Sequence, residues 1–186
     1  MGTTANFDSP AATGIAAADT FPLIDATTNR PKTGTVSQLT QASVGVVDTT
    51  ATVLALTAAL HANKIVTVSS TAPIAITLPA SAGTGNRYRL NIRVLATTTG
   101  HTIKVANTTD VMSGLVFGHL TVSTTVGTVV SFKATATDDT ITINGTTQGG
   151  VVGDIIELTD IKTGFWEVKM RTSPTGTHAT PFSATV

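Results

Sequence analysis

The sequence predicts an all-β protein, an antiparallel β-sandwich of jelly-roll type with an extended N-terminal arm. Thr alternates with Val, Ile and Leu in many short segments, and β-branched side chains fit a pleated, half-buried surface better than a helix. These segments recur roughly every 8–12 residues between turn-forming residues, a pattern typical of a sandwich. Hydrophobic residues make up 41% of the chain but aromatic residues only 4%, so the core must consist mainly of small branched side chains.

Residues 1–45 are expected to form an arm or attachment segment. Met1–Thr20 is rich in Ala, Thr, Gly and Asp and poor in large apolar side chains, so it cannot bury enough surface to fold alone. The next four residues, Phe21, Pro22, Leu23 and Ile24, form a short apolar island. Such an island is expected to dock on the main domain or on a neighbouring chain.

Residues 46–172 are expected to form the sandwich body, because alternating segments and turn signals follow one another along this stretch. One helical turn is expected at Thr57–Asn63, which is rich in Ala. The expected strands are Val53–Leu56, Lys64–Ser69, Ile74–Leu78, Arg87–Leu95, Thr102–Ala106, Thr128–Thr135, Thr140–Asn144, Asp154–Thr159 and Trp166–Arg171.

Residues 173–186 carry two Pro and show no periodicity. This composition predicts a C-terminal tail on the surface.

The charge balance argues against a nucleic-acid partner. Eleven Lys and Arg balance eleven Asp and Glu, and no basic run is present to attract phosphates. Arg87, Arg89 and Arg93 form the densest basic patch, and their even spacing places them on one face of a strand. A solvated or interface-facing strand is favoured there over an anion site. No apolar stretch of 18 residues occurs, so no membrane partner is expected.

Candidate chemistry is sparse, and no catalytic, cofactor-binding or metal-binding residues are expected. The only glutamates, Glu157 and Glu167, lie on consecutive expected strands, where a hairpin could bring them together like a glycosidase pair. A solvated surface is strongly favoured for both. The histidines lack metal-binding spacing, and the glycine-rich segment 149–153 leads into a strand instead of the helix that a phosphate loop requires. The four histidines are His61, His101, His119 and His178.

Tyr88 and Trp166 are the only large polar aromatic residues. A lectin exposes such rings to sugars, but Trp166 follows Phe165 in an apolar strand. Anchoring of the core is therefore the favoured role for this pair.

Several segments, taken in order, resemble a module of capsid decoration and fibre proteins of tailed bacteriophages. The first is Ile74–Leu90, an alternating strand, a Leu-Pro step, a glycine-bearing turn and a second alternating strand. The others are Thr140–Asp154, Gly164–Val168 and Gly176–Ser183. The resemblance as a whole covers approximately residues 50–183. The resemblance implies a virion protein with a β-sandwich body, commonly trimeric, on the outer shell, and it carries over no catalytic residues.

The resulting expectation is a non-enzymatic decoration (cement) protein on the outer capsid surface of the virion. It would bind the major capsid protein as a homotrimer and bridge coat subunits, with Phe21–Ile24 as the contact segment, through many modest contacts repeated by symmetry. The alternative is a head or tail fibre or spike component that binds a host glycan. A glycan-degrading enzyme, based on Glu157 and Glu167 alone, is the third hypothesis.

Overall fold

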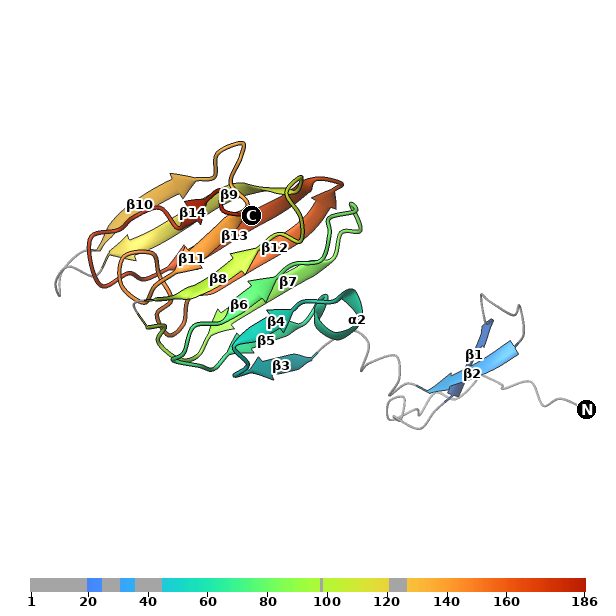
Figure 1. Cartoon of the computed structure of the whole chain (residues 1–186). Coiled ribbons are helices and arrows are strands. Elements are labelled where there is room, and N and C mark those ends of the chain that lie inside the picture. Colours follow the sequence, from blue (N-terminus) through green and yellow to red (C-terminus); the bar gives the residue numbers. More distant parts are fainter. Residues whose placement is uncertain (1–19, 25–30, 36–44, 98, 121–126) are drawn as a thin grey trace, which may run out of the picture. The chain divides into compact units, whose positions relative to one another are not determined.

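The computed structural model describes residues 20–24, 31–35, 45–97, 99–120 and 127–186, and its chain divides into two compact units, residues 1–45 and 46–186. The first unit contains a two-stranded antiparallel sheet of β1 (Thr20–Ile24) and β2 (Pro31–Thr35), with Thr20 opposite Thr35 (Figure 1). The apolar island of the sequence is therefore most of strand β1.

The second unit consists of two sheets and a short helix, α2 (Ala58–His61). Thr57 begins this helix, because its hydroxyl accepts the N–H of Leu60. The seven-stranded sheet has the order β10 (Thr128–Lys133), β9 (Val111–Leu120), β13 (Phe165–Thr172), β12 (Ile155–Lys162), β7 (Arg87–Ile92), β5 (Ile65–Val68) and β3 (Val46–Thr49). The five-stranded sheet has the order β14 (Phe182–Ser183), β11 (Thr140–Ile143), β8 (His101–Lys104), β6 (Ala75–Thr77) and β4 (Val53–Ala55).

Both sheets are mixed, so the prediction of a purely antiparallel sandwich is wrong, and a jelly-roll order of strands is not confirmed. From β3 to β8 the chain alternates between the two sheets, one strand in each (Figure 1). Each strand therefore lies beside the strand two positions earlier and runs in the same direction, which makes β3, β5 and β7 parallel, and likewise β4, β6 and β8. A strand in the opposite sheet thus supplies the crossover that parallel pairing requires.

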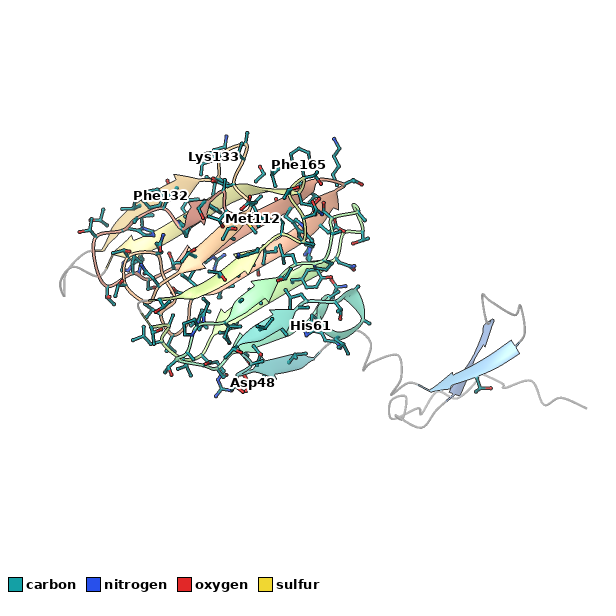
Figure 2. All side chains as sticks on the ribbon, viewed as in Figure 1. Asp48, His61, Met112, Phe132, Lys133 and Phe165 are labelled. Atoms are coloured by element: carbon teal, nitrogen blue, oxygen red, sulfur yellow. The ribbon has the colours of Figure 1, made fainter. Side chains whose placement is uncertain are left out.

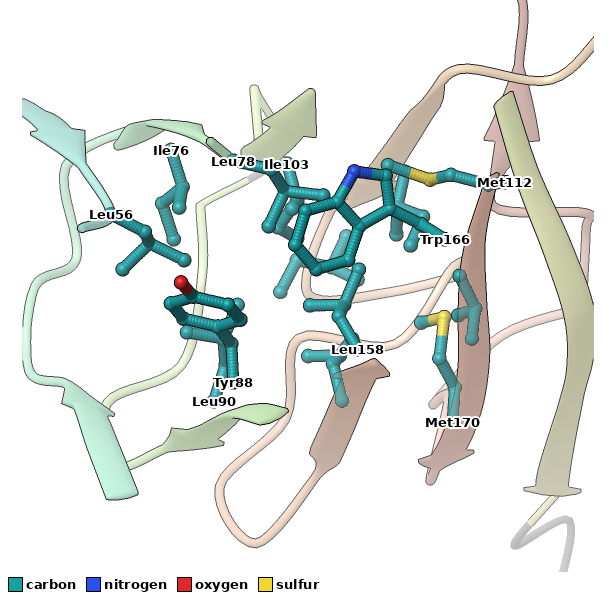
Figure 3. Close-up of a cluster of buried hydrophobic side chains, with 14 of the residues drawn as sticks. Leu56, Ile76, Leu78, Tyr88, Leu90, Ile103, Met112, Leu158, Trp166 and Met170 are labelled. Atoms are coloured by element: carbon teal, nitrogen blue, oxygen red, sulfur yellow. The ribbon is translucent and has the colours of Figure 1, made fainter. Parts of the chain in front are cut away.

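The inner faces of the two sheets share one hydrophobic core (Figure 3). Most of its side chains are Val, Ile and Leu, as the composition predicts. Tyr88 and Trp166 are each 1% exposed and meet edge to face, with ring centroids 5.7 Å apart. The predicted role of this pair as core anchors is confirmed.

Three strands of the body, β3, β9 and β14, were not expected from the sequence. The alternation of β9 is weakened because Gly114 and Gly118 stand at two of its positions. The C-terminal segment is not a plain surface tail. Phe182 is 6% exposed within the core, β14 pairs with β11, and the N–H of Thr185 donates to the carboxylate of Asp139.

The two glycines of β9 are required by close packing. A Cβ at Gly114 would overlap the backbone carbonyl of Val168 on β13, and a Cβ at Gly118 would overlap the imidazole of His178. That imidazole also packs edge-on against Phe132, with ring centroids 4.9 Å apart. His178 therefore fills the space that Gly118 leaves and ties the C-terminal segment to β9 and β10.

We predict that Gly118→Ala lowers the free energy of unfolding by about 1–3 kcal/mol, the usual cost of overpacking. In a His178→Ala background the same substitution should cost clearly less, because the overlapping ring is gone. Urea denaturation of the two single variants and the double variant measures this coupling. Gly176→Ala is the control, since its Cβ would make only an ordinary contact with Thr147. Equal costs of Gly118→Ala in both backgrounds would contradict the assigned packing.

Candidate interaction surface

The outer faces of the two sheets differ in their chemistry. Strand alternation and register determine which side chains point outward. On the five-stranded sheet these are small and mostly uncharged, and we call this the Thr-rich face. Its residues are Val53, Ala55, Ala75, Thr77, Thr102, Lys104, Thr142 and Ser183.

The outer face of the seven-stranded sheet carries large apolar and charged side chains, and we call it the mixed face. Asp48 on β3 and Lys133 on β10 lie at its two edges (Figure 2). Between them lie Val46, Ile65, Thr67, Arg87, Arg89, Asn91, Ser113, Leu115, Phe117, Val129, Ser131, Ile155, Glu157, Thr159, Glu167, Lys169 and Arg171.

The two glutamates lie on the mixed face, but they are not directly opposite each other. In the pairing of β12 with β13, Glu157 faces Lys169 and Glu167 faces Thr159. Each glutamate meets a cation: Arg89 Nη1 lies 3.6 Å from Glu157 Oε1, and Lys169 Nζ lies 3.1 Å from Glu167 Oε1. Because these side chains are more than a third exposed, such ion pairs contribute little to stability.

Arg87, Arg89 and Arg93 were singled out in the sequence as a patch on one strand face. Arg87 and Arg89 point outward from β7 on the mixed face. Arg93 follows the end of β7, and its charge lies close enough to Asp48 to lower the pKa of that carboxyl, after the larger effects of hydrogen bonds from Ser69 and Thr67. The mixed face therefore holds Arg87 and Arg89 of this patch, and Lys169 and Arg171 of β13 extend it.

The surface of the body has many more cations than anions. Five aspartates of the described residues are buried: Asp110, Asp138, Asp139, Asp154 and Asp160. No Lys or Arg in the same residues is buried. The acidic side chains left at the surface of the body are Asp48, Glu157 and Glu167, against nine Lys and Arg. A chain of zero formal charge thus presents a basic outer face.

Asp160 shows why the aspartates are buried. Its carboxylate accepts the N–H groups of Ala82, Gly83 and Thr84 and the Thr84 hydroxyl at 2.7–3.0 Å. Burial raises the pKa of Asp160, but the hydrogen bonds together outweigh it and hold the pKa below its ordinary value. The carboxylate therefore organises the loop between β6 and β7.

The carboxylate of Asp154 organises the glycine-rich segment 149–153 in a similar way. It accepts the N–H groups of Gly150, Val151 and Ser173. Burial is the largest effect on the pKa of Asp154 and raises it. Because two N–H groups of the segment already bind this carboxylate, they are not directed at an external anion.

Three of the four histidines, His61, His101 and His178, are at least partly buried within the fold. The N–H of Thr57 donates to Nδ1 of His61 at 3.0 Å, and the N–H of Ile74 donates to Nδ1 of His101 at 3.1 Å. Burial lowers the pKa of both rings and of His178. Across the described part of the chain, no three His, Cys, Asp or Glu side chains gather in a way that could hold a metal ion.

Three hollows lie on the mixed face. The central one, of about 540 Å³, is lined by Leu115, Phe117, Ile155 and Arg171 among others. A hollow of about 310 Å³ adjoins it on the side of β5 and shares Arg89 and both glutamates. A third, of about 270 Å³, adjoins it on the side of β10 and shares Phe117, Ile155 and Arg171. We call the three together the trough.

We predict that Asp160→Asn lowers the free energy of unfolding at pH 7 by roughly 2–3 kcal/mol, because a charged acceptor of several N–H groups is lost. A carboxylate whose pKa is lower in the folded protein than in the unfolded chain stabilises the fold at pH values above its unfolded pKa of about 3.9. This stabilisation is lost as the pH falls through the pKa of the folded state. The difference between wild type and variant should therefore shrink below about pH 4. Denaturant titrations at a series of pH values test this. Glu157→Gln, the control, should change stability by at most about 0.5 kcal/mol.

The chain was compared with known proteins in three ways. No family model matches it, and neither the curated proteins nor the solved structures include a match. Within the described residues, no helix has the length and apolar character needed to cross a membrane.

Proposed function

We propose that this chain is a decoration (cement) protein of a tailed bacteriophage, a non-enzymatic structural component that binds the outer capsid surface and bridges coat subunits. The observation that carries the proposal is the contrast between the two outer faces of the body. A cement protein needs one face that adheres to the shell and another that tolerates solvent. The mixed face and the Thr-rich face meet these two needs.

The size of the mixed face fits a modest contact. Seven strands and about six residues along them cover roughly 30 Å by 20 Å. This is somewhat less than the roughly 800 Å² per partner of a standard protein interface. A single copy would then bind weakly, but a trimer that engages several coat subunits multiplies the effect. The proposed Phe21–Ile24 contact would add a second point of attachment for each copy.

A fibre or spike component that binds a host glycan is the second candidate. Its support is the exposure of Phe117, which is 51% exposed on the mixed face. Against it, Trp166 and Tyr88 lie in the core and are not available as platforms for sugars. A glycan array separates the two candidates, since selective glycan binding would favour the fibre.

We predict that the protein in solution is a homotrimer, with a mass three times that of the 18.9 kDa chain. Sedimentation equilibrium over a range of concentrations measures this mass. A mass equal to that of one chain throughout the range would remove the avidity on which the proposed mechanism depends.

We also predict that Phe21→Ser combined with Leu23→Ser lowers occupancy on the particle. The assay mixes the full-length protein with purified particles of the encoding phage from which the protein has been stripped, and quantifies bound protein after sedimentation. The expected loss is about tenfold or more in apparent affinity, the usual consequence of removing two apolar anchors. Thr33→Ala, at an exposed position of β2, is the control and should bind as wild type. Unchanged binding of the double variant would reject the arm as a contact.

A further inference from the structure

The trough is long and open, which suits an extended polypeptide better than a compact small molecule. Its hollows follow one another from β5 to β10 and share lining residues. Five steps between neighbouring strands span about 24 Å, the length of about seven residues of extended chain. An occupant that fills the trough therefore has the dimensions of a short extended segment.

The centre of the trough is apolar. Leu115 and Phe117 point outward from β9 and are 41% and 51% exposed. Ile155 of β12 lines the same hollow. Single exposed apolar side chains are normal on protein surfaces, but several that line one concave site mark a place for apolar groups of a partner.

The charge left without a partner in the described lining of the trough is positive, since Asp154, which lines the third hollow, is buried and already accepts three N–H groups. Both glutamates already lie close to Arg89 and Lys169. In the described residues, no carboxylate lies within salt-bridge distance of Arg87 or Arg171. Guanidinium groups bind carboxylates through two parallel hydrogen bonds, so these two side chains are suited to acidic groups.

Arg171 lies where the apolar and the positively charged parts of the trough meet. In the register of the sheet it lies between Ile155 on β12 and Phe117 on β9. A carboxylate that binds this guanidinium would be flanked by apolar side chains, which exclude water and strengthen the ion pair. A nucleic acid is a poorer fit, because it carries a phosphate at every nucleotide, whereas Arg89 and Lys169 of the central hollow already lie close to Glu157 and Glu167 and its remaining cation is Arg171.

We infer that the trough binds an extended polypeptide segment that carries both acidic and apolar side chains, with its carboxylates at Arg171 and Arg87 and its apolar groups against Leu115 and Phe117. The identity of the segment as part of the coat protein rests on the proposed function. The chemical class of the segment rests on the trough alone.

The first experiment uses the full-length protein and the stripped particles. Arg171→Glu and Leu115→Ser should each weaken binding about tenfold or more, as expected for a charged and an apolar anchor at the centre of an interface. Lys104→Glu and Val53→Ser make the same changes on the Thr-rich face and should bind as wild type. Because none of the four positions is buried, all four variants are expected to fold. Thermal melting checks this.

The second experiment needs no particles. Fluorescein-labelled poly-L-glutamate should bind the isolated protein, and this binding should weaken with added salt. The substitution Arg171→Glu should abolish the binding, whereas Lys104→Glu should leave it unchanged. Labelled poly-L-lysine should not bind.

The outcomes separate the two proposals. Wild-type protein that binds poly-L-glutamate through Arg171 but does not bind particles would overturn the proposed function and keep the inference about the trough. Particle binding that is unchanged in Arg171→Glu and Leu115→Ser would overturn the inference and keep the proposed function. Preferential binding of a labelled oligodeoxythymidylate over poly-L-glutamate, lost in Arg171→Glu, would also overturn the inference, because the partner would then be a nucleic acid.

Discussion

The burial of small branched side chains between two sheets is the constraint on which the rest of this structure depends. A strand has two faces, and in the body the inner face of nearly every strand is needed for the shared core. With so few aromatic residues, the core must be continuous across both sheets. Tyr88 and Trp166 are both buried in this core. Side chains available to partners are therefore confined to the outer faces and the loops.

The loops impose a second requirement, which explains the uneven distribution of charge. A loop packed against a sandwich has N–H groups that lack strand partners. In this protein aspartate carboxylates accept many of them. Asp160 of β12 binds N–H groups of the loop between β6 and β7, Asp154 binds those of the loop between β11 and β12, and Asp139, which precedes β11, binds N–H groups of the C-terminal segment. Because acidic residues are used inside and Lys and Arg are not, a chain with no net charge exposes a basic face. The charge of the sequence as a whole thus conceals the electrostatics of its surface.

The sequence predicted the strands that alternate clearly, because period-two alternation is a local property. Ile141 and Ile143 of β11 and the run of β13 around Trp166 are examples. It did not predict β9, since glycines replace side chains at positions 114 and 118 and the reason for them, a carbonyl and an imidazole from distant segments, is not local. Nor could it predict parallel pairing, because alternation determines which side of a strand is buried and not which strand lies beside it.

The candidate surface was predicted only in part for the same reason. Even spacing placed Arg87 and Arg89 on one face of a strand, but their neighbours Leu115, Phe117 and Arg171 come from other strands and depend on register. A hairpin that pairs the two glutamates was one hypothesis, but the register of β12 and β13 sets Glu157 opposite Lys169 and Glu167 opposite Thr159. A patch that is assembled from four strands leaves no motif in the linear sequence.

The central claim is that the body adheres to a shell through the mixed face. A cryo-electron microscopy map of the intact particle of the encoding phage tests it most directly. The account predicts density for this chain on the outer capsid surface, with β9, β13, β12 and β7 turned toward the coat and the Thr-rich face toward solvent. Density for the chain in the tail, or on the capsid with the Thr-rich face against the coat, would contradict it.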